Sequence, residues 1–195
     1  MIINIKNMVS LRCILKVKEE LYKLDINFHQ VRLGEVITVF QVDKARINLL
    51  KETLLNSGLE IVEDKKPILV EKVKACVVEY FDFSKEVPLA KFSDYLREEL
   101  KLNYNYIANV FSEMTGLTIG KYLLLYKIEK AKEMISYGEM NFTEIAYKLN
   151  FSSIAHFSNS FKSIYGNTPS EYKCGEKMRI KVENLVQFAN KQEID

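Results

Sequence analysis

The sequence lacks any long apolar run and any recognisable secretion signal. Its longest apolar stretches, such as YLLLY at Tyr122–Tyr126, are far shorter than the roughly 20 residues that a bilayer span needs. The N-terminus, MIINIKNMVSLRC, has no basic start, continuous apolar stretch or small-residue cleavage site. We therefore expect a cytoplasmic protein that crosses no membrane.

Cysteine and histidine are also scarce. The three cysteines, Cys13, Cys76 and Cys174, are odd in number and widely spaced, which argues against a disulfide framework and favours a reducing compartment. The sequence has two histidines, no nucleophile motif beside them and no glycine-rich phosphate loop. Catalysis needs such a constellation. We therefore expect neither enzymatic activity nor a cofactor.

No segment carries a marked excess of one charge. Residues 1–84 hold 13 Lys and Arg against 12 Asp and Glu, residues 85–175 hold 11 against 10, and the tail holds 4 against 4. A DNA-binding domain usually has a stronger basic bias. Charge alone therefore does not predict binding to nucleic acid. Because 48% of the residues are hydrophobic, a folded protein is expected.

Strand-like and helix-like patterns alternate over the first 64 residues. A strand at residues 2–5 precedes a helix over Ser10–Leu24. The segments INFHQVRL and VITVF flank Gly34-Glu35, a two-residue connection typical of a tight hairpin. A second helix opens at the cap candidate Asp43 and ends at Gly58, before the strand LEIV. This β-α-β-β-α-β order predicts a ferredoxin-like unit, with two helices on one face of a four-stranded antiparallel sheet.

The rest of the chain is helical in character. A helix from Lys66 to Phe81 packs on the first domain or bridges to the next, and the segment DFSKEVP interrupts the pattern before a helical region begins at Pro88. We therefore predict an α+β protein with four parts: a ferredoxin-like domain (1–64), a bridging helix and linker (65–87), an all-α double helix-turn-helix domain (88–174) and a tail (175–195). The tail has the apolar spacing of one amphipathic helix, and packing or dimerisation are both open to it.

Helix-capping signals recur at short intervals after Pro88. Asn141 is followed three residues later by Glu144, and Thr168 is followed by Pro169 and Glu171, which is the spacing of a capping box. Further cap candidates are Ser93, Asn103 and Thr118. Helices this short, separated by three or four residues, suit helix-turn-helix packing.

The segment Asn141–Lys173 carries the functional prediction. Apolar residues of a first short helix, Ile145, Ala146 and Leu149, can pack against Phe157 and Phe161 of a second, across the turn NFSS. Recurrence at helical spacing marks the phenylalanines as core residues and not as base-stacking groups. A second helix held in this way has an exposed outer face that can enter the DNA major groove.

This segment resembles the C-terminal DNA-binding domain of the AraC-type transcriptional regulators. The resemblance covers roughly Pro88–Lys173 and rests on Glu144, Ile145, Ala146, Phe151, Ser152, Ser153, Phe157, Phe161, Lys162, Gly166, Thr168, Pro169 and Tyr172, with Phe111, Thr115, Gly116, Tyr122, Lys127 and Ala131 upstream. It implies two helix-turn-helix units, joined by a long helix, that read successive major-groove faces.

The resemblance also implies roles for individual residues. Base-facing candidates are Asn105, Tyr106, Ala108 and Asn109 in the first unit and Ile154, Ala155, Ser158 and Asn159 in the second. Because Asn can pair with adenine and Ala or Ile can meet a thymine methyl, we expect a preference for A·T pairs at some positions. Candidates for contacts with phosphates are Lys121, Lys127, Lys162, Ser152 and Ser153. His156 is interpreted as a groove-edge or partly buried residue.

The chain departs from the family pattern at three positions. Asn150 stands where family members often carry Gly, but Asn tolerates a left-handed backbone, so the turn can survive. Asn109 and Asn159 stand where Arg is frequent, and each loss of a bidentate guanine contact removes about 1 to 3 kcal/mol of discrimination. We therefore expect weak DNA affinity or a need for dimerisation.

Two functions follow from these patterns. The leading one is a transcriptional regulator that binds double-stranded DNA, with RNA polymerase, a second copy of the chain and an effector that no residue identifies as further candidate partners. The alternative is a protein-interaction adaptor that has kept the helical fold while losing DNA affinity, as the near-neutral charge suggests.

The first domain resembles heavy-metal-associated domains at one loop. NMVSLRC, Asn7–Cys13, stands where those domains carry Met-x-Cys-x-x-Cys, but Ser10 replaces the first cysteine. Soft cations such as Cu(I) require two thiolates there. Cys13 is thus a weak metal candidate, no metal site is assigned, and Ser10 is a helix N-cap candidate. A dimerisation or effector-binding module is the expected role.

Overall fold

In a computed structural model of the protein, the residues described are 1–83, 91–174, 185, 186 and 189. They divide into two units, one of Met1–Glu79 with Ser93–Met114 and one of Tyr80–Phe92 with the residues from Thr115 onward. Most of the predicted tail helix and of the linker DFSKEVP lies outside the described residues. Of the described helices, none is both long enough and apolar enough to span a lipid bilayer.

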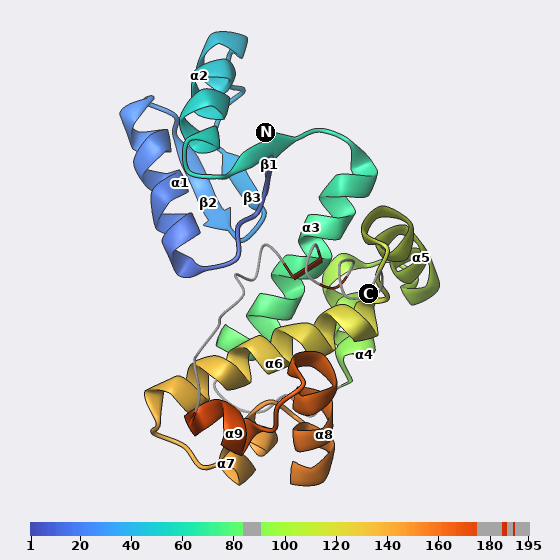
Figure 1. Ribbon diagram of the computed structural model, residues 1–195. Coiled ribbons are helices and arrows are strands. Elements are labelled where there is room, and N and C mark those ends of the chain that lie inside the picture. Colours follow the sequence, from blue (N-terminus) through green and yellow to red (C-terminus); the bar gives the residue numbers. More distant parts are fainter. Residues whose placement is uncertain (84–90, 175–184, 187–188, 190–195) are drawn as a thin grey trace. The chain divides into compact units, whose positions relative to one another are not determined.

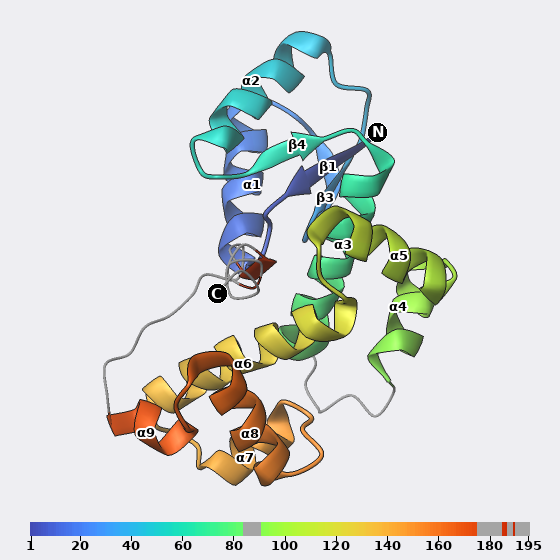
Figure 2. The same cartoon turned by 45° about the vertical axis from the view of Figure 1, so that its right-hand side comes forward.

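A small four-stranded sheet organises the first unit. Its strands, β1 (Ile2–Lys6), β2 (Phe28–Arg32), β3 (Glu35–Thr38) and β4 (Glu60–Val62), pair antiparallel in the order β2-β3-β1-β4. The helices α1 (Leu11–Lys23) and α2 (Lys44–Leu55) contact each other and cover one face of the sheet (Figures 1 and 2). The core between them contains fully buried side chains of both layers: Ile5, Val17, Leu21, Val36, Leu50 and Leu54.

The hairpin between β2 and β3 turns one residue earlier than predicted. Arg32 pairs with Glu35, so the connecting residues are Leu33 and Gly34 and not Gly34 and Glu35. Gly34 has a φ of 80°, which glycine adopts without the strain that a Cβ would cause. Leu33 is buried, and its packing fixes the register because a shift of one residue would expose it.

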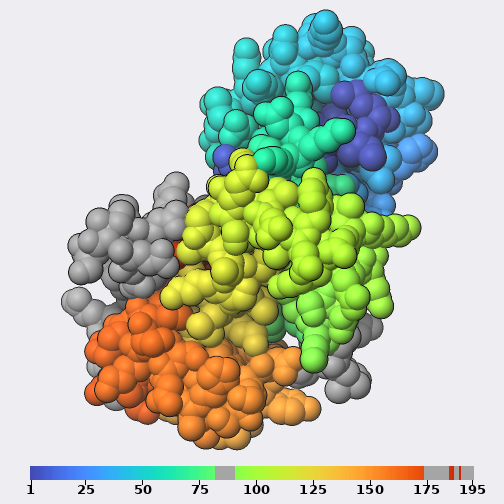
Figure 3. All heavy atoms as spheres, turned by 90° about the vertical axis from the view of Figure 1, so that its right-hand side faces the viewer, coloured from blue at the N-terminus to red at the C-terminus, as the bar shows by residue number. Residues whose placement is uncertain are grey.

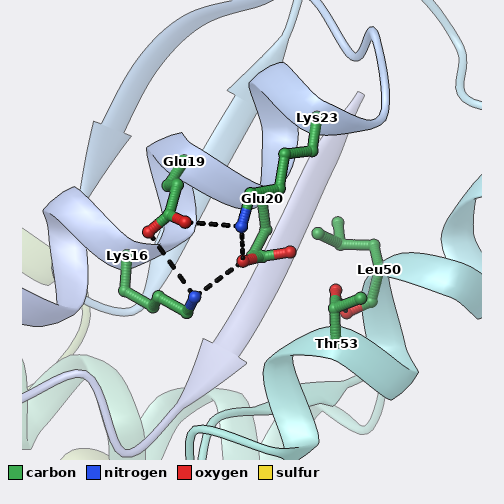
Figure 4. Close-up of polar contacts among 6 residues, drawn as sticks. All are labelled: Lys16, Glu19, Glu20, Lys23, Leu50 and Thr53. Atoms are coloured by element: carbon green, nitrogen blue, oxygen red, sulfur yellow. Dashed lines mark hydrogen bonds and ion pairs between the residues drawn. The ribbon is translucent and has the colours of Figure 1, made fainter.

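A network of charges allows α1 to bury a carboxylate against α2. Glu20 is only 5% exposed, and its Oε1 accepts hydrogen bonds from Lys16 Nζ at 2.7 Å and from Lys23 Nζ at 3.0 Å. These bonds lower the pKa of Glu20. Figure 4 shows this network on the side of α1 that faces Leu50 and Thr53 of α2. Leu11, Leu15 and Tyr22 of α1 stay more than half exposed.

The loop after β1 is tied to a third helix, α3 (Lys65–Val78), which also contacts β1. Asn7, with a φ of 68°, donates its backbone N–H to Glu71 Oε2 at 2.9 Å and its side-chain Nδ2 to the Gly58 carbonyl at 3.0 Å. The Cys13 thiol lies 3.4 Å from Ser10 Oγ. Within the described residues, no three His, Cys, Asp or Glu side chains gather as a metal-ligand group.

The helix start at Ser10 differs in one respect from a typical N-cap. Ser10 has the extended backbone of a cap, but its side chain makes no capping hydrogen bond. Its hydroxyl contacts the Cys13 thiol instead. Asp43, in contrast, caps α2 as predicted, since its carboxylate accepts from the Arg46 N–H at 2.9 Å.

The first unit also contains the helices α4 (Phe92–Leu100) and α5 (Tyr104–Thr115). The cap prediction at Asn103 is confirmed, since its Oδ1 accepts from the Asn105 N–H at 2.9 Å. The cap prediction at Ser93 is wrong. The helix begins one residue earlier, at Phe92, whose buried ring packs against Tyr80 with a centroid distance of 5.1 Å.

The second unit consists of helices packed around α6 (Ile119–Tyr137). The unit begins within a π-helical turn, η1 (Glu79–Phe83). After α6 the chain forms three further helices: α7 (Phe142–Lys148), α8 (Ile154–Tyr165) and α9 (Pro169–Cys174). The helices α7, α8 and α9 each contact α6, α7 contacts α8, and α8 contacts α9. The predicted caps at Thr118, Asn141 and Thr168 all form.

Candidate nucleic-acid interface

The helices α7 and α8 are clamped together by a buried apolar layer. Ile145 and Ala146 of α7 and its C-cap residue Leu149 are at most 3% exposed, and Phe157 and Phe161 of α8 are fully buried. Aromatic rings continue this layer along α8, with centroid distances of 5.3 Å for Phe151–Phe157 and 6.0 Å for Phe157–Phe161. The predicted core role of these phenylalanines is therefore confirmed.

Both ends of α7 are fixed by local backbone chemistry. At its start, Asn141 and Glu144 form a complete capping box, with bonds of 2.9 Å and 2.8 Å. At its end, Asn150 adopts a left-handed backbone with a φ of 53°, a conformation that Asn tolerates better than most residues. Ser153 then caps α8 by accepting from the His156 N–H at 3.0 Å. The two helices are thus joined by a defined turn.

The outward face of α8 is open. Ser152, Ser153, Ile154, Ala155, Asn159 and Lys162 are exposed, and Ser158 is half-buried. Ile154 is 45% exposed although it is apolar, so its side chain is available to a partner. The orange spheres of Figure 3 show α7 and α8 at the surface of the molecule.

A polar pair at the start of α8 was not predicted as a contact. His156 Nδ1 lies 2.9 Å from Ser152 Oγ, and the imidazole packs edge-on to Phe151 with a centroid distance of 5.4 Å. His156 is exposed, so its second ring nitrogen can reach a ligand. Ser152 lies just before the Ser153 cap of α8, and the closeness of the two residues in the sequence is the signal that could have identified this pair.

The corresponding helix of the first unit presents a similar surface. Asn105, Tyr106 and Asn109 of α5 are exposed and Ala108 is half-buried, while Ile107, Val110 and Phe111 are buried on the opposite side. Neither Lys nor Arg occurs in α5, and the one lysine of α8 is Lys162. These faces offer mainly amide, hydroxyl and apolar groups.

The two predicted phosphate-contact lysines of α6 lie in different surroundings. Lys121 is exposed at the start of the helix. Lys127 is half-buried, and its Nζ donates a hydrogen bond to the Asn150 carbonyl at 2.9 Å. Burial lowers the pKa of Lys127 to about 8. This ammonium is engaged with the turn between α7 and α8.

Comparison with known proteins agrees with this geometry. Residues 96–174 match a protein family described as "Helix-turn-helix domain". The Msm operon regulatory protein of Streptococcus mutans is 21% identical over 150 residues, which cover 72% of this chain and 54% of that protein. The probable transcriptional regulator LumQ of Photobacterium leiognathi is 21% identical over 183 residues, which cover 89% of this chain and 70% of that protein.

A solved structure also resembles this chain. It is the C-terminal domain of AraT, a response regulator from Geobacillus stearothermophilus. The two structures align over 58% of this chain and 88% of that chain, with a TM-score of 0.48 and 21% sequence identity. Several curated relatives are longer than this chain, which spans 54%, 12% and 30% of the length of three of them. From the family match and the regulators that align with it, residues 96–174 of this chain form a helix-turn-helix domain similar to those of transcriptional regulators.

Proposed function

We propose that the protein is a sequence-specific, DNA-binding transcriptional regulator. The observation that carries this proposal is the face of α8, open from Ser152 to Lys162 above a layer of buried aromatic rings. An α-helix held in this way fits the major groove of B-DNA. The curated relatives described above are named as regulators, which supports the same role.

The exposed side chains suggest how the contacts divide. Asn159 can pair with adenine, and Ile154 and Ala155 can meet thymine methyl groups, so α8 favours A·T pairs at some positions. Asn105, Tyr106, Ala108 and Asn109 are the candidates on α5. Lys121, Lys162, Ser152 and Ser153 are suited to phosphates, and His156 joins them through its bond to Ser152.

The two helix-turn-helix segments differ in charge. Residues 91–114 carry three Lys and Arg against four Asp and Glu, whereas residues 115–174 carry seven against five. Phosphate contacts come from cations. We therefore infer that the second segment supplies most of the electrostatic attraction and that the first mainly adds base contacts.

Selection of binding sites from random DNA tests the proposal. The full chain should enrich a defined sequence, and Asn159→Ala should relax discrimination at one position by about 1 to 3 kcal/mol. Asn167→Ala is the matched control, because Asn167 is an exposed asparagine that lies beyond the end of α8. Enrichment of no sequence by the parent chain would refute the proposal.

The alternative is a protein-interaction adaptor without DNA affinity, favoured by the small net charge of +2. Salt dependence separates the two functions. If Lys121, Lys148, Lys162 and Lys173, all exposed, each neutralise one phosphate, log K falls against log salt with a slope of about −4 per chain. A slope near zero would favour the adaptor.

We further infer that residues 1–64 form a ferredoxin-like domain that serves as a dimerisation or effector-binding module. The antiparallel strand order β2-β3-β1-β4 and the two helices on one face support the fold assignment. We place the DNA-binding domain at residues 88–174, while RNA polymerase and an effector remain candidate partners.

Dimerisation through α1 follows from its exposed apolar stripe. Leu11, Leu15 and Tyr22 are 55%, 57% and 70% exposed. Arg12 and Glu19 flank the stripe on one side and are also exposed. An antiparallel second copy would bring Arg12 of one chain alongside Glu19 of the other, and we therefore infer a second copy as the occupant of this face.

A further inference from the structure

The turn between α7 and α8 is held by two residues that belong to neither helix. Lys127 of α6 donates its Nζ hydrogen bond to the Asn150 backbone carbonyl at 2.9 Å. Burial raises the pKa of Tyr80 of η1, and a hydrogen bond with the Asn150 side chain opposes that shift. Asn150 is the residue with the left-handed backbone, so both bonds meet at the point where the chain direction changes.

Two aromatic rings lie near the Lys127 ammonium. Its Nζ lies 4.9 Å from the centroid of Phe151, the residue after Asn150, and 5.6 Å from that of Phe81. Phe81 packs in turn on Tyr126 of α6, with a centroid distance of 5.9 Å. Cation–π attraction and the hydrogen bond therefore act on the same two turn residues.

The tyrosine comes from a segment of unusual geometry. Residues Glu79–Phe83 form a π-helical turn that follows α3 without a break in the chain, and π-turns often occur at functional sites. Tyr80 is 4% exposed, and its ring contacts Phe92. The chain therefore runs from the end of α3 into η1, which contains Tyr80, the residue bonded to the Asn150 side chain.

We propose that Tyr80, Lys127 and Asn150 form a clamp that positions α8 for DNA, with the tyrosine supplied by η1. The reason is geometric. The helix α8 begins at Ile154, four residues after Asn150, so a change of backbone angle at the turn redirects its whole outward face. Both the side chain and the carbonyl of Asn150 are bonded from outside α7 and α8, so these two bonds restrain the backbone at the turn. This proposal rests on the DNA-binding function proposed above.

Two variants remove the tyrosine bond and little else. Tyr80→Phe keeps the ring that packs on Phe92, and Asn150→Gly keeps both the left-handed turn and the carbonyl that Lys127 uses. We expect each to raise amide hydrogen exchange over residues 151–157 of the free protein by about 3- to 10-fold, the effect of one hydrogen bond. Because the two variants delete the same bond, the double variant should show no further increase. Tyr147→Phe, at an exposed tyrosine of α7, is the matched control.

DNA binding gives the second measurement, on the sequence that the full chain selects. Tyr80→Phe and Asn150→Gly should weaken binding by about 3- to 10-fold without changing its salt slope, since no phosphate contact is lost. Lys127→Met should also leave the slope unchanged, whereas Lys162→Met should reduce its magnitude by about one.

Three results would overturn the proposal. The first is unchanged hydrogen exchange in both Tyr80→Phe and Asn150→Gly, and the second is an additive increase of exchange in the double variant. The third is a salt slope that falls in magnitude by about one in Lys127→Met, which would make this lysine a phosphate contact. Hydrogen exchange needs no DNA. If the parent chain selects no sequence, the proposed function is refuted. The hydrogen-exchange data still test whether the clamp exists.

Discussion

At the scale of single residues, a buried ion pair stands out in the second unit. Lys132 of α6 is fully buried, and its Nζ lies 3.0 Å from Oε1 of Glu129, which is 5% exposed. Tyr165 of α8 donates its hydroxyl to the same carboxylate oxygen. Burial and this hydrogen bond raise the pKa of Tyr165. Hydrogen bonds to the Glu129 carboxylate therefore join α8 to α6. Removal of one partner would leave the carboxylate buried with fewer hydrogen bonds.

Lys132→Met should therefore destabilise the protein strongly. It leaves the buried Glu129 carboxylate without the lysine that lies against it, which costs about 3 to 5 kcal/mol. Lys130→Met is the control, because the Lys130–Glu133 pair has the same spacing on the same helix but side chains that are 22% and 27% exposed. Its loss should cost less than about 1 kcal/mol. Urea unfolding measures both, and equal losses would contradict the expectation.

Glu79 is a half-buried residue whose pKa is changed by its surroundings. Burial raises its pKa, the Glu99 carboxylate raises it further, and Arg32 opposes the shift. The folded protein therefore holds a proton on Glu79 at pH values where the unfolded chain has lost it. The stability that this proton contributes is fully present below pH 4.5, the ordinary pKa, and is lost as pH rises through the raised pKa.

Glu79→Gln should remove this pH dependence. The amide resembles the protonated acid at every pH, so the variant should be more stable than the parent at pH 7 and show a flatter profile above pH 4.5. Thermal unfolding across the acidic and neutral range measures the difference. Glu98→Gln, at an exposed carboxylate of α4, should change stability by less than about 0.5 kcal/mol at pH 7. A parent more stable than Glu79→Gln at pH 7 would refute the argument.

At the scale of elements, two helix starts that both have a predicted cap residue differ in how well they are capped. Asn141 accepts two backbone N–H groups at the start of α7, whereas the Ser10 side chain caps nothing at the start of α1. Asn141→Ala should therefore cost about 1 to 2 kcal/mol, while Ser10→Ala should cost less than about 0.5 kcal/mol. Chemical denaturation of the two variants checks this order, and a reversal would show that hydroxyl contacts matter more than caps here.

The contrast also shows what sequence patterns can predict. Local sequence determines most of the caps, because each depends on residues two or three apart: Asp43, Asn103, Thr118, Asn141 and Thr168. Burial of Phe157 and Phe161 follows from helical spacing. The tie between Tyr80 and Asn150 joins residues that are 70 positions apart in sequence, and no local pattern indicates it. The direction of Lys127 toward the turn was missed for the same reason.

The helix α1 and the β2-β3 hairpin also show what the sequence pattern could not predict. The apolar spacing of Ser10–Leu24 predicts α1, but it does not show that Leu11 and Leu15 stay exposed while Glu20 is buried. Two lysines of the same helix make that burial possible. In the hairpin, the glycine signal located the turn, while the burial of Leu33 moved the turn by one residue.

At the scale of the whole molecule, assembly is the property to measure. If two copies pair through α1, Leu15→Lys should weaken self-association by about 10-fold or more, since a charge replaces an apolar contact at the centre of the stripe. Leu55→Lys on α2 is the matched control, because Leu55 is 62% exposed but lies outside the stripe. Sedimentation over a range of concentrations measures both. A parent chain that stays monomeric at high concentration would rule the interface out.

The scarcity of cations on α5 and α8 has a consequence for how such a protein searches a chromosome. Every stretch of DNA presents the same phosphates, so a strongly basic surface spends most of its time on irrelevant sites. The exposed faces of α5 and α8 present mainly amides, hydroxyls and methyl groups, so they should dissociate quickly from DNA of non-specific sequence. Occupancy of the correct site then depends on base pairs matched one by one.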